Sequence, residues 1–147
     1  MQTSSLVGKA KELYEKDFYL WIQQTSQNLS SKNFNDLDLE NLIEEIEAMG
    51  RSEKTALASN LRILLMHLLK YKYQPEKRSN SWQYTIFEHR NRIQDIFESS
   101  PSLKRYYEEI FEKSYQKARQ AASIGTGLPL SQFPEICPFT QAEILED

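Results

Sequence analysis

The side chains best suited to chemistry fall on one helical line in the middle of the chain. Glu53, Asn60 and His67 are spaced seven residues apart, and a helix with this sequence would carry them in or beside one apolar stripe. His89 falls within the apolar stripe of the next predicted helix. A carboxylate, an amide and two imidazoles would then point toward a helical interior. Because burying such groups unpaired costs roughly 1 to 3 kcal/mol each, they require partners.

Two interpretations of these four residues remain open. Helical bundles build metal sites from carboxylates and imidazoles, so the four are candidate ligand-binding, metal-binding or acid–base groups. The alternative is a hydrogen-bonded core network that fixes the helix register, and the sequence favours it because the Glu-x-x-His spacing of di-iron bundles is absent. No catalytic residue is assigned, and no cofactor can be named.

A second group of candidates is basic and interleaved with aromatic residues. Its phosphate-binding candidates are Lys70, Lys72, Lys77, Arg78 and Arg90. Such cations hold phosphates, and exposed aromatic rings can stack on bases. Their stems also commonly cover apolar surface, and the sequence shows no recognised nucleic-acid-binding module. The sequence therefore favours a structural role, with phosphate or nucleic-acid binding and a surface for a partner protein as the alternatives.

Charge is divided unevenly along the 147 residues, whose formal net charge is −3. Residues 1–50 contain four Lys and nine acids, residues 51–119 contain fourteen Lys or Arg and eight acids, and the remainder contains four acids. The basic middle could bind phosphate, or its acidic flanks could neutralise it on folding. Overall acidity weakens long-range attraction to nucleic acid and favours the second interpretation.

Cys137 is the only cysteine, so an intrachain disulfide is excluded. Its neighbours Ile136 and Pro138 are apolar and neither histidine is close in sequence, which favours packing over nucleophilic chemistry. The first residues lack the apolar run of a signal peptide, and no apolar stretch approaches the roughly 20 residues that span a bilayer. We therefore expect a cytoplasmic protein without a membrane segment.

The elements that must position these residues are helices. Glycine and proline are scarce before the last quarter of the chain, which disfavours a many-turned β fold. We predict an all-α, single-domain bundle over residues 1–147, with about four long helices. Residues 1–6 are expected to be disordered. The first helix is predicted at about 7–29.

One long, bent helix is predicted at about 37–73. Its apolar residues recur every three or four positions before Gly50, at Leu39, Leu42, Ile43, Ile46 and Met49. The stripe resumes in phase after Gly50, at Leu57, Leu61, Leu64 and Leu68. We therefore favour one helix kinked at Gly50, and the alternative is that Gly50 ends it and Ser52 caps a second helix. Asn35, Asp36 and Asp38 are its candidate N-caps.

Two further helices and an extended segment complete the prediction. One helix is expected at about 81–98, and Ser100 followed by Pro101 predicts the start of the last long helix. Gly125 is its expected C-cap. Three prolines favour an extended strap over the bundle at 125–139. Thr140 and Glu143 resemble a capping box that opens a final short helix.

Blocks of residues from about Tyr14 to Leu145 also occur in a recognisable order. They are residues 37–47, 50–53, 64–70, 74–76, 81–82, 99–103, 127–129 and 133–135. In these blocks the chain resembles family twenty-nine of the domains of unknown function. The resemblance implies a small helical bacterial protein, of a kind common in cyanobacteria. It implies no activity and no catalytic residue.

Three classes of function follow from these observations. A non-enzymatic protein-interaction or regulatory module, binding itself or another protein, best explains the absence of a catalytic motif. A bundle that binds a metal or small ligand through Glu53, Asn60, His67 and His89 is the first alternative. Phosphate or nucleic-acid binding through the basic middle is the second.

Overall fold

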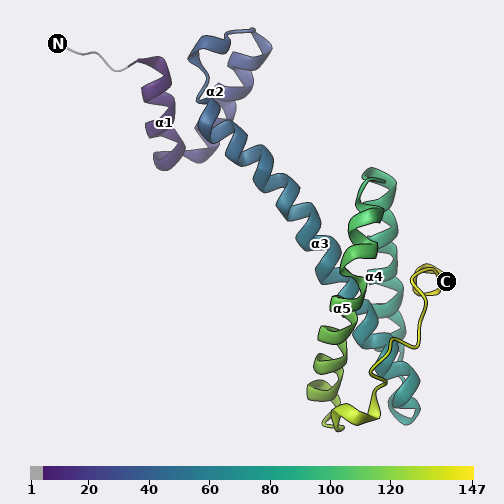
Figure 1. Ribbon diagram of the computed structural model, residues 1–147. Coiled ribbons are helices and arrows are strands. Elements are labelled where there is room, and N and C mark those ends of the chain that lie inside the picture. Colours follow the sequence, from purple (N-terminus) through teal and green to yellow (C-terminus); the bar gives the residue numbers. More distant parts are fainter. Residues whose placement is uncertain (1–4) are drawn as a thin grey trace. The chain divides into compact units, whose positions relative to one another are not determined.

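The computed structural model describes residues 5–147 (Figure 1). Over this range the chain is all-α, with five α-helices, four short 3₁₀ turns and no strand, as the sequence predicts. It divides into two compact units, one ending at Arg51 and one beginning at Ser52, which are described separately. The disorder expected at 1–6 falls partly on residues 1–4, outside the described range. It is wrong for Ser5 and Leu6, which cap and begin the first helix.

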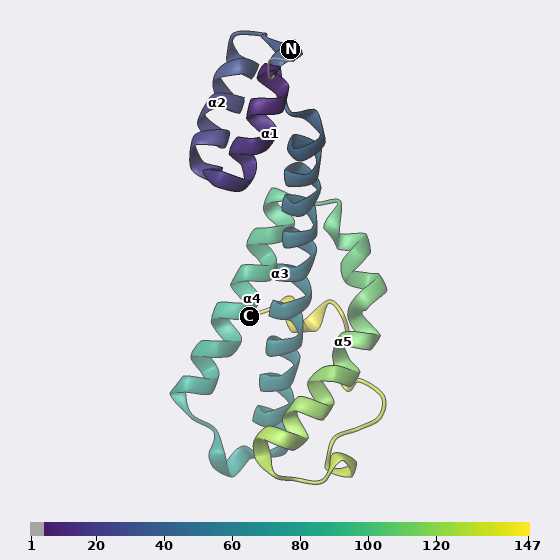
Figure 2. The ribbon, with the colours of Figure 1, turned by 90° about the vertical axis from the view of Figure 1, so that its left-hand side faces the viewer.

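In the first unit the single helix expected at 7–29 is two helices, α1 (Leu6–Lys16) and α2 (Phe18–Ser30), which lie side by side (Figures 1 and 2). Asp17 separates them: its extended backbone ends α1, and its carboxylate accepts a hydrogen bond from the Leu20 amide at 3.1 Å. The break was missed because aspartate is tolerated inside a helix but is also a strong N-cap.

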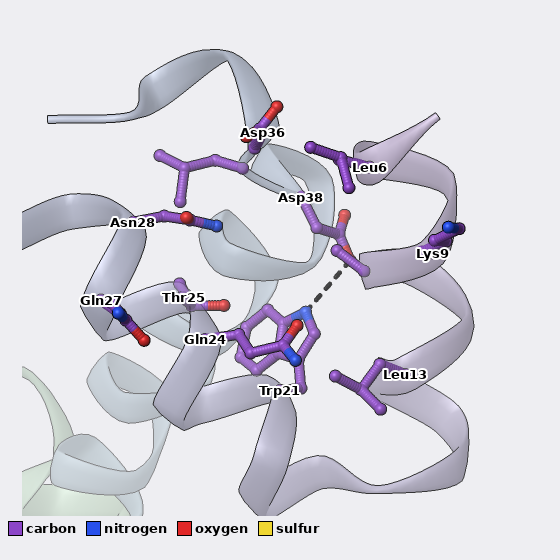
Figure 3. A pocket seen from close by; sticks show the side chains of 12 residues that line it. Leu6, Lys9, Leu13, Trp21, Gln24, Thr25, Gln27, Asn28, Asp36 and Asp38 are labelled. Atoms are coloured by element: carbon purple, nitrogen blue, oxygen red, sulfur yellow. Dashed lines mark hydrogen bonds between the residues drawn. The ribbon is translucent and has the colours of Figure 1, made fainter. Parts of the chain in front are cut away.

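Asp38 begins the longest helix, α3 (Leu39–Tyr73). Its side chain is only 1% exposed and accepts hydrogen bonds from the Asn41 amide at 3.3 Å and from Asn41 Nδ2 at 2.6 Å. Trp21 Nε1 donates to the same carboxylate at 3.3 Å (Figure 3). Of the predicted caps, Asp38 is therefore confirmed, whereas Asn35 and Asp36 lie in the preceding 3₁₀ turn, Phe34–Asp36.

α3 continues without interruption through Gly50, so the prediction of one long helix is confirmed. Its part in the second unit packs beside α4 (Asn80–Ser99) and α5 (Leu103–Thr126) (Figure 2). Five α3 leucines in this part are fully buried: Leu57, Leu61, Leu64, Leu65 and Leu69. Residues of α4, α5 and the C-terminal segment complete the same core. This part of α3 is the central element that its apolar composition predicts.

The ends of α4 and α5 differ in detail from the sequence prediction. Ser79 caps α4 by accepting from the Trp82 amide at 3.2 Å. α5 begins at Leu103 rather than at Pro101, because residues 100–102 form a turn between the helices. α5 also ends later than expected: Gly127, with φ +75°, is its left-handed C-cap, and Gly125 lies within the helix.

After Gly127 the chain runs as the predicted strap along α5. Phe133 is 1% exposed and packs in the core. Tyr115 Oη donates to the Pro134 carbonyl at 2.5 Å, and Arg119 Nε donates to the Phe133 carbonyl at 2.9 Å. These side chains satisfy backbone groups that a strap leaves unpaired. The strap contains one 3₁₀ turn, Leu130–Gln132.

The capping box near the C-terminus is confirmed. The Thr140 amide donates to Glu143 Oε1 at 2.9 Å, and the Glu143 amide donates to Thr140 Oγ1 at 3.0 Å. The final element is one short 3₁₀ helix, Glu143–Leu145. Its Ile144 side chain is 1% exposed and anchors the end of the chain in the core of the second unit.

Candidate functional site

Two of the four candidate core residues meet between α3 and α4. His89 Nδ1 lies 2.7 Å from Asn60 Oδ1, and Asn60 Nδ2 donates to the Ala56 carbonyl at 2.8 Å. Because the amide nitrogen is used by that carbonyl, its oxygen faces the imidazole, and His89 Nδ1 is the donor. Burial lowers the pKa of His89, and the positive charge of Arg92 lowers it further. The pair is therefore a neutral imidazole that donates to an amide.

The other two candidates do not join this pair. His67 Nδ1 lies 3.1 Å from the Ile63 carbonyl of its own helix, and burial lowers its pKa. Glu53 is exposed. Within residues 5–147 no three His, Cys, Asp or Glu side chains come close enough together to hold a metal ion. The hydrogen bond that a core network requires is present, and ligand binding by these four residues stays a prediction.

The two arginines among the phosphate-binding candidates donate to backbone carbonyls. Arg78 Nε donates to the Tyr71 carbonyl at 2.7 Å, and its guanidinium carbon lies 4.4 Å from the centroid of the Tyr71 ring. Arg90 Nε donates to the Ile144 carbonyl at 2.8 Å. Arg78 thus fixes the connection after α3, and Arg90 fixes the C-terminal turn on α4.

The three lysines of the same group lie near aromatic rings or in solvent. Lys70 Nζ is 6.0 Å from the centroid of Trp82, and Lys72 Nζ is 5.5 Å from that of Phe139. Lys77 is exposed. These positions show cations extended over aromatic surface, an arrangement that stabilises the fold. Phosphate binding by the basic middle stays a prediction.

An apolar groove in the first unit was missed by the sequence analysis. α2 and the first part of α3 enclose a volume of about 570 Å³. Its apolar walls are Phe18, Ile22 and Leu29 from α2 and Leu42, Ile46 and Met49 from α3. We call this feature the α2–α3 groove.

The side chains of this groove are unusually exposed. Ile46 is 60% exposed and Met49 is 68% exposed, and Phe18 on the facing helix is 45% exposed. The apolar stripe from Leu39 to Met49 forms one face of a helix, as its spacing indicates, but most of its side chains are exposed. Periodicity identifies an apolar helix face, but it does not show whether the chain has another element to cover that face.

The groove is almost without charge. α2 contains no charged residue between Phe18 and Ser30, and Glu45 is the one charged residue among those that line the groove in the described structure. Tyr14 Oη donates to Glu45 Oε1 at 2.8 Å, and this bond raises the pKa of the Tyr14 phenol. The uncharged α2, facing an apolar stripe on the next helix, was the sequence signal for this surface.

Cys137 offers no activated nucleophile. Its side chain is half-buried and packs against the core of the second unit. Burial raises the pKa of its thiol, whereas a nucleophilic cysteine requires a lowered pKa. The position therefore serves packing, as its apolar neighbours indicate.

Over residues 5–147 the chain is a small all-α protein whose first unit carries an exposed apolar groove. The family described as "Domain of unknown function DUF29" matches residues 13–147, and the chain belongs to this family. No curated protein and no solved structure matches the chain. None of the helices in the described range has the length and apolar character to cross a membrane.

Proposed function

We propose that the chain is a non-enzymatic protein-interaction module whose α2–α3 groove binds an amphipathic helix of another protein. The exposure of Ile46 and Met49 beside Phe18 is the observation that carries this proposal. Exposed apolar side chains gathered on one face are typical of interaction surfaces. Apolar grooves between helices commonly accept the apolar face of a further helix.

The spacing of the groove residues suits a helical occupant. Leu42, Ile46 and Met49 follow one another at four and three residues on α3, and Phe18 and Ile22 are four residues apart on α2. Such rows form ridges, and a third helix can place its own ridge between them. A partner helix would bury side chains that residues 5–51 leave in solvent.

Charge favours a basic partner over a second copy of this chain. Residues 5–51 contain five Lys or Arg and nine Asp or Glu, a net charge of −4. Two copies joined through this groove would bring two acidic units together, which is unfavourable. A partner helix with Lys or Arg beside its apolar face is attracted by the same charges, including Glu45 on the groove wall.

Fluorescence of Trp21, which lines the groove, tests this proposal. In full-length chain carrying Trp82→Phe, Trp21 is the only tryptophan. A helical Leu/Lys peptide should change its emission saturably, and a Leu/Glu peptide of the same apolar pattern should not. Ile46→Glu should weaken binding of the basic peptide about tenfold or more.

The matched control is Ile124→Glu, which places the same charge at an 84% exposed position of α5. It should leave peptide binding unchanged. Equal binding by the Ile46→Glu and Ile124→Glu chains would refute the groove as the binding surface. Equal binding of the acidic and basic peptides would refute the partner's proposed charge.

A further inference from the structure

Tyr14 of α1 contacts both walls of the α2–α3 groove without itself lining the groove. Its ring packs edge-on against Phe18 and Trp21 on the α2 wall, with centroid distances of 5.6 and 5.0 Å. Its hydroxyl donates to Glu45 Oε1 on the α3 wall at 2.8 Å. A change at Tyr14 can therefore alter how the walls are held while every lining side chain is kept.

Glu45 differs from the two glutamates that precede it on α3. Glu40 Oε2 lies 3.2 Å from Lys11 Nζ. Glu44 Oε1 lies 2.7 Å from Arg51 Nη2. Glu45 is half-buried, and in the described part of the chain it forms no ion pair. Because the phenol that donates to it is neutral, its negative charge is left for a cation from another molecule.

The bond from Tyr14 orients this carboxylate before a partner arrives. A free glutamate side chain moves among several rotamers, and ordering it on binding lowers the affinity. Tyr14 holds Oε1, and the Tyr14 ring is itself held by Phe18 and Trp21. Oε2 accepts no hydrogen bond from residues 5–147. It is therefore the oxygen that remains for a donor of the partner.

The contacts of Tyr14 place the charge at one end of the groove. Phe18 is the first residue of α2, whereas Leu29 lies near the end of that helix. Because Tyr14 packs on Phe18 and binds Glu45, the carboxylate lies toward the Phe18 end. The other lining residues, as far as Leu29, carry no charge. A bound helix therefore meets one negative group at one end of an otherwise uncharged groove.

We infer that Tyr14 is a positioning residue that sets the charge selectivity of the groove. It holds Glu45 so that Oε2 accepts hydrogen bonds from a Lys or Arg side chain near one end of the partner helix. Such charge-assisted bonds gain most when the groups are already oriented. This inference rests on the proposed function, and it adds the residue that makes the groove prefer a basic helix.

Two helical peptides with one apolar pattern measure this selectivity: the Leu/Lys peptide and a peptide with glutamine in place of every lysine. Their dissociation constants come from the midpoints of Trp21 emission titrations in full-length chain carrying Trp82→Phe. Midpoints are compared because Tyr14 contacts Trp21 and can change the amplitude. The chain with Tyr14 and Glu45 intact should bind the lysine peptide about tenfold more tightly than the glutamine peptide.

Tyr14→Phe keeps the ring and removes only the hydroxyl. It should weaken binding of the lysine peptide about fivefold and leave binding of the glutamine peptide unchanged. Glu45→Gln removes the charge and should weaken binding of the lysine peptide at least as much. In the Glu45→Gln chain, adding Tyr14→Phe should cause no further loss, because both changes act on one interaction.

The matched control is Tyr84→Phe, which removes a hydroxyl from a 63% exposed tyrosine of α4 in the second unit. It should change neither dissociation constant. Helical circular dichroism verifies that each variant folds.

An unchanged preference for the lysine peptide in the Tyr14→Phe chain would overturn the inference and leave the groove proposal standing. Equal losses of affinity for both peptides would overturn it as well, because they would show that the hydroxyl only supports the fold. So would a Tyr14→Phe effect of the same size in the Glu45→Gln chain. An unchanged preference in the Glu45→Gln chain would overturn it even if Tyr14→Phe did not fold. The absence of saturable binding by either peptide would instead refute the proposed function, and this inference with it.

Discussion

At the scale of single residues, the Asn60–His89 pair shows how a polar group is accommodated between helices. The amide bridges the Ala56 carbonyl of its own helix and the imidazole of α4. Each bond satisfies a group that would otherwise be costly to bury. Burial and the nearby positive charge of Arg92 favour the neutral form of His89, and Nδ1–H donates to Asn60 in that form.

This preference for neutral imidazole predicts a dependence of stability on pH. Burial lowers the pKa of both His89 and His67 below the ordinary value of 6.5. As pH falls below about 6.5, the unfolded chain therefore takes up protons before the folded chain does. Stability is fully present above that pH and should decline as pH falls toward the lower folded-state pKa values. Thermal unfolding followed by circular dichroism from pH 7.5 to 5.5 measures this decline.

The control for the pH prediction is a chain carrying His67→Gln and His89→Gln. Glutamine does not titrate, so this chain should lose less stability over the same interval. Carboxylates contribute equally to both chains and cancel in the comparison. Identical pH profiles for the two chains would contradict a role for the histidines.

At the scale of elements, the glycines of the two longest helices permit a matched test. Gly50 lies inside α3, and an added Cβ would meet no atom within 4 Å. Gly50→Ala should therefore stabilise the chain by about 0.5 to 1 kcal/mol, because alanine favours helix. Gly127 has φ +75°, so Gly127→Ala should destabilise by about 1 kcal/mol. Urea unfolding of both variants measures the two free energies.

The changes in unfolding free energy caused by Gly50→Ala and Gly127→Ala should therefore have opposite signs. Gly125→Ala is a third comparison, because Gly125 lies inside α5 and an added Cβ would approach the flexible Lys70 Nζ at 3.1 Å. Its effect should be smaller than that of Gly127→Ala. A larger cost at Gly125 than at Gly127 would contradict the assignment of the C-cap.

The helices could be predicted from sequence where one signal dominated. The uninterrupted leucine phase predicted α3 through Gly50, and the spacing of Thr140 and Glu143 predicted their reciprocal bonds. The break at Asp17 could not be predicted in the same way. The residues on both sides of Asp17 have helical periodicity, so nothing in the pattern showed that Asp17 ends one helix and caps the next. The sequence could not show whether Gly125 or Gly127 is the C-cap of α5, because both are glycines. The positive φ of Gly127 in the structure identifies it as the cap.

The candidate site was less predictable than the helices. The helical wheel placed Asn60 and His89 toward the interior, and they do meet. The same wheel placed Glu53 in or beside the stripe, but that side chain is exposed. A wheel gives the direction of a residue only relative to its own helix. Whether another helix packs against that face depends on contacts between segments that are distant in sequence. In the first unit the stripe that ends at Met49 stays largely exposed.

At the scale of the whole molecule, buried apolar surface is unequally divided. The first unit has two buried apolar side chains among its described residues, Trp21 and Leu37. Fifteen buried residues form one core in the second unit. Because apolar burial is the main favourable term in folding, the second unit has far more stabilisation from its own core. The prediction of a single domain has to be tested against this division.

We expect the first unit to unfold before the second in urea. Trp21 belongs to the first unit and Trp82 to the second, so their two indole Nε1–H signals in ¹⁵N-labelled chain report the units separately. The native Trp21 signal should disappear at a lower urea concentration than that of Trp82, because regions with few buried apolar contacts open at lower free energy. A basic amphipathic peptide that binds the α2–α3 groove should raise the Trp21 midpoint and leave the Trp82 midpoint unchanged. Coincident loss of both signals would instead show that α3, which continues from one unit into the other, makes the chain unfold as one cooperative domain.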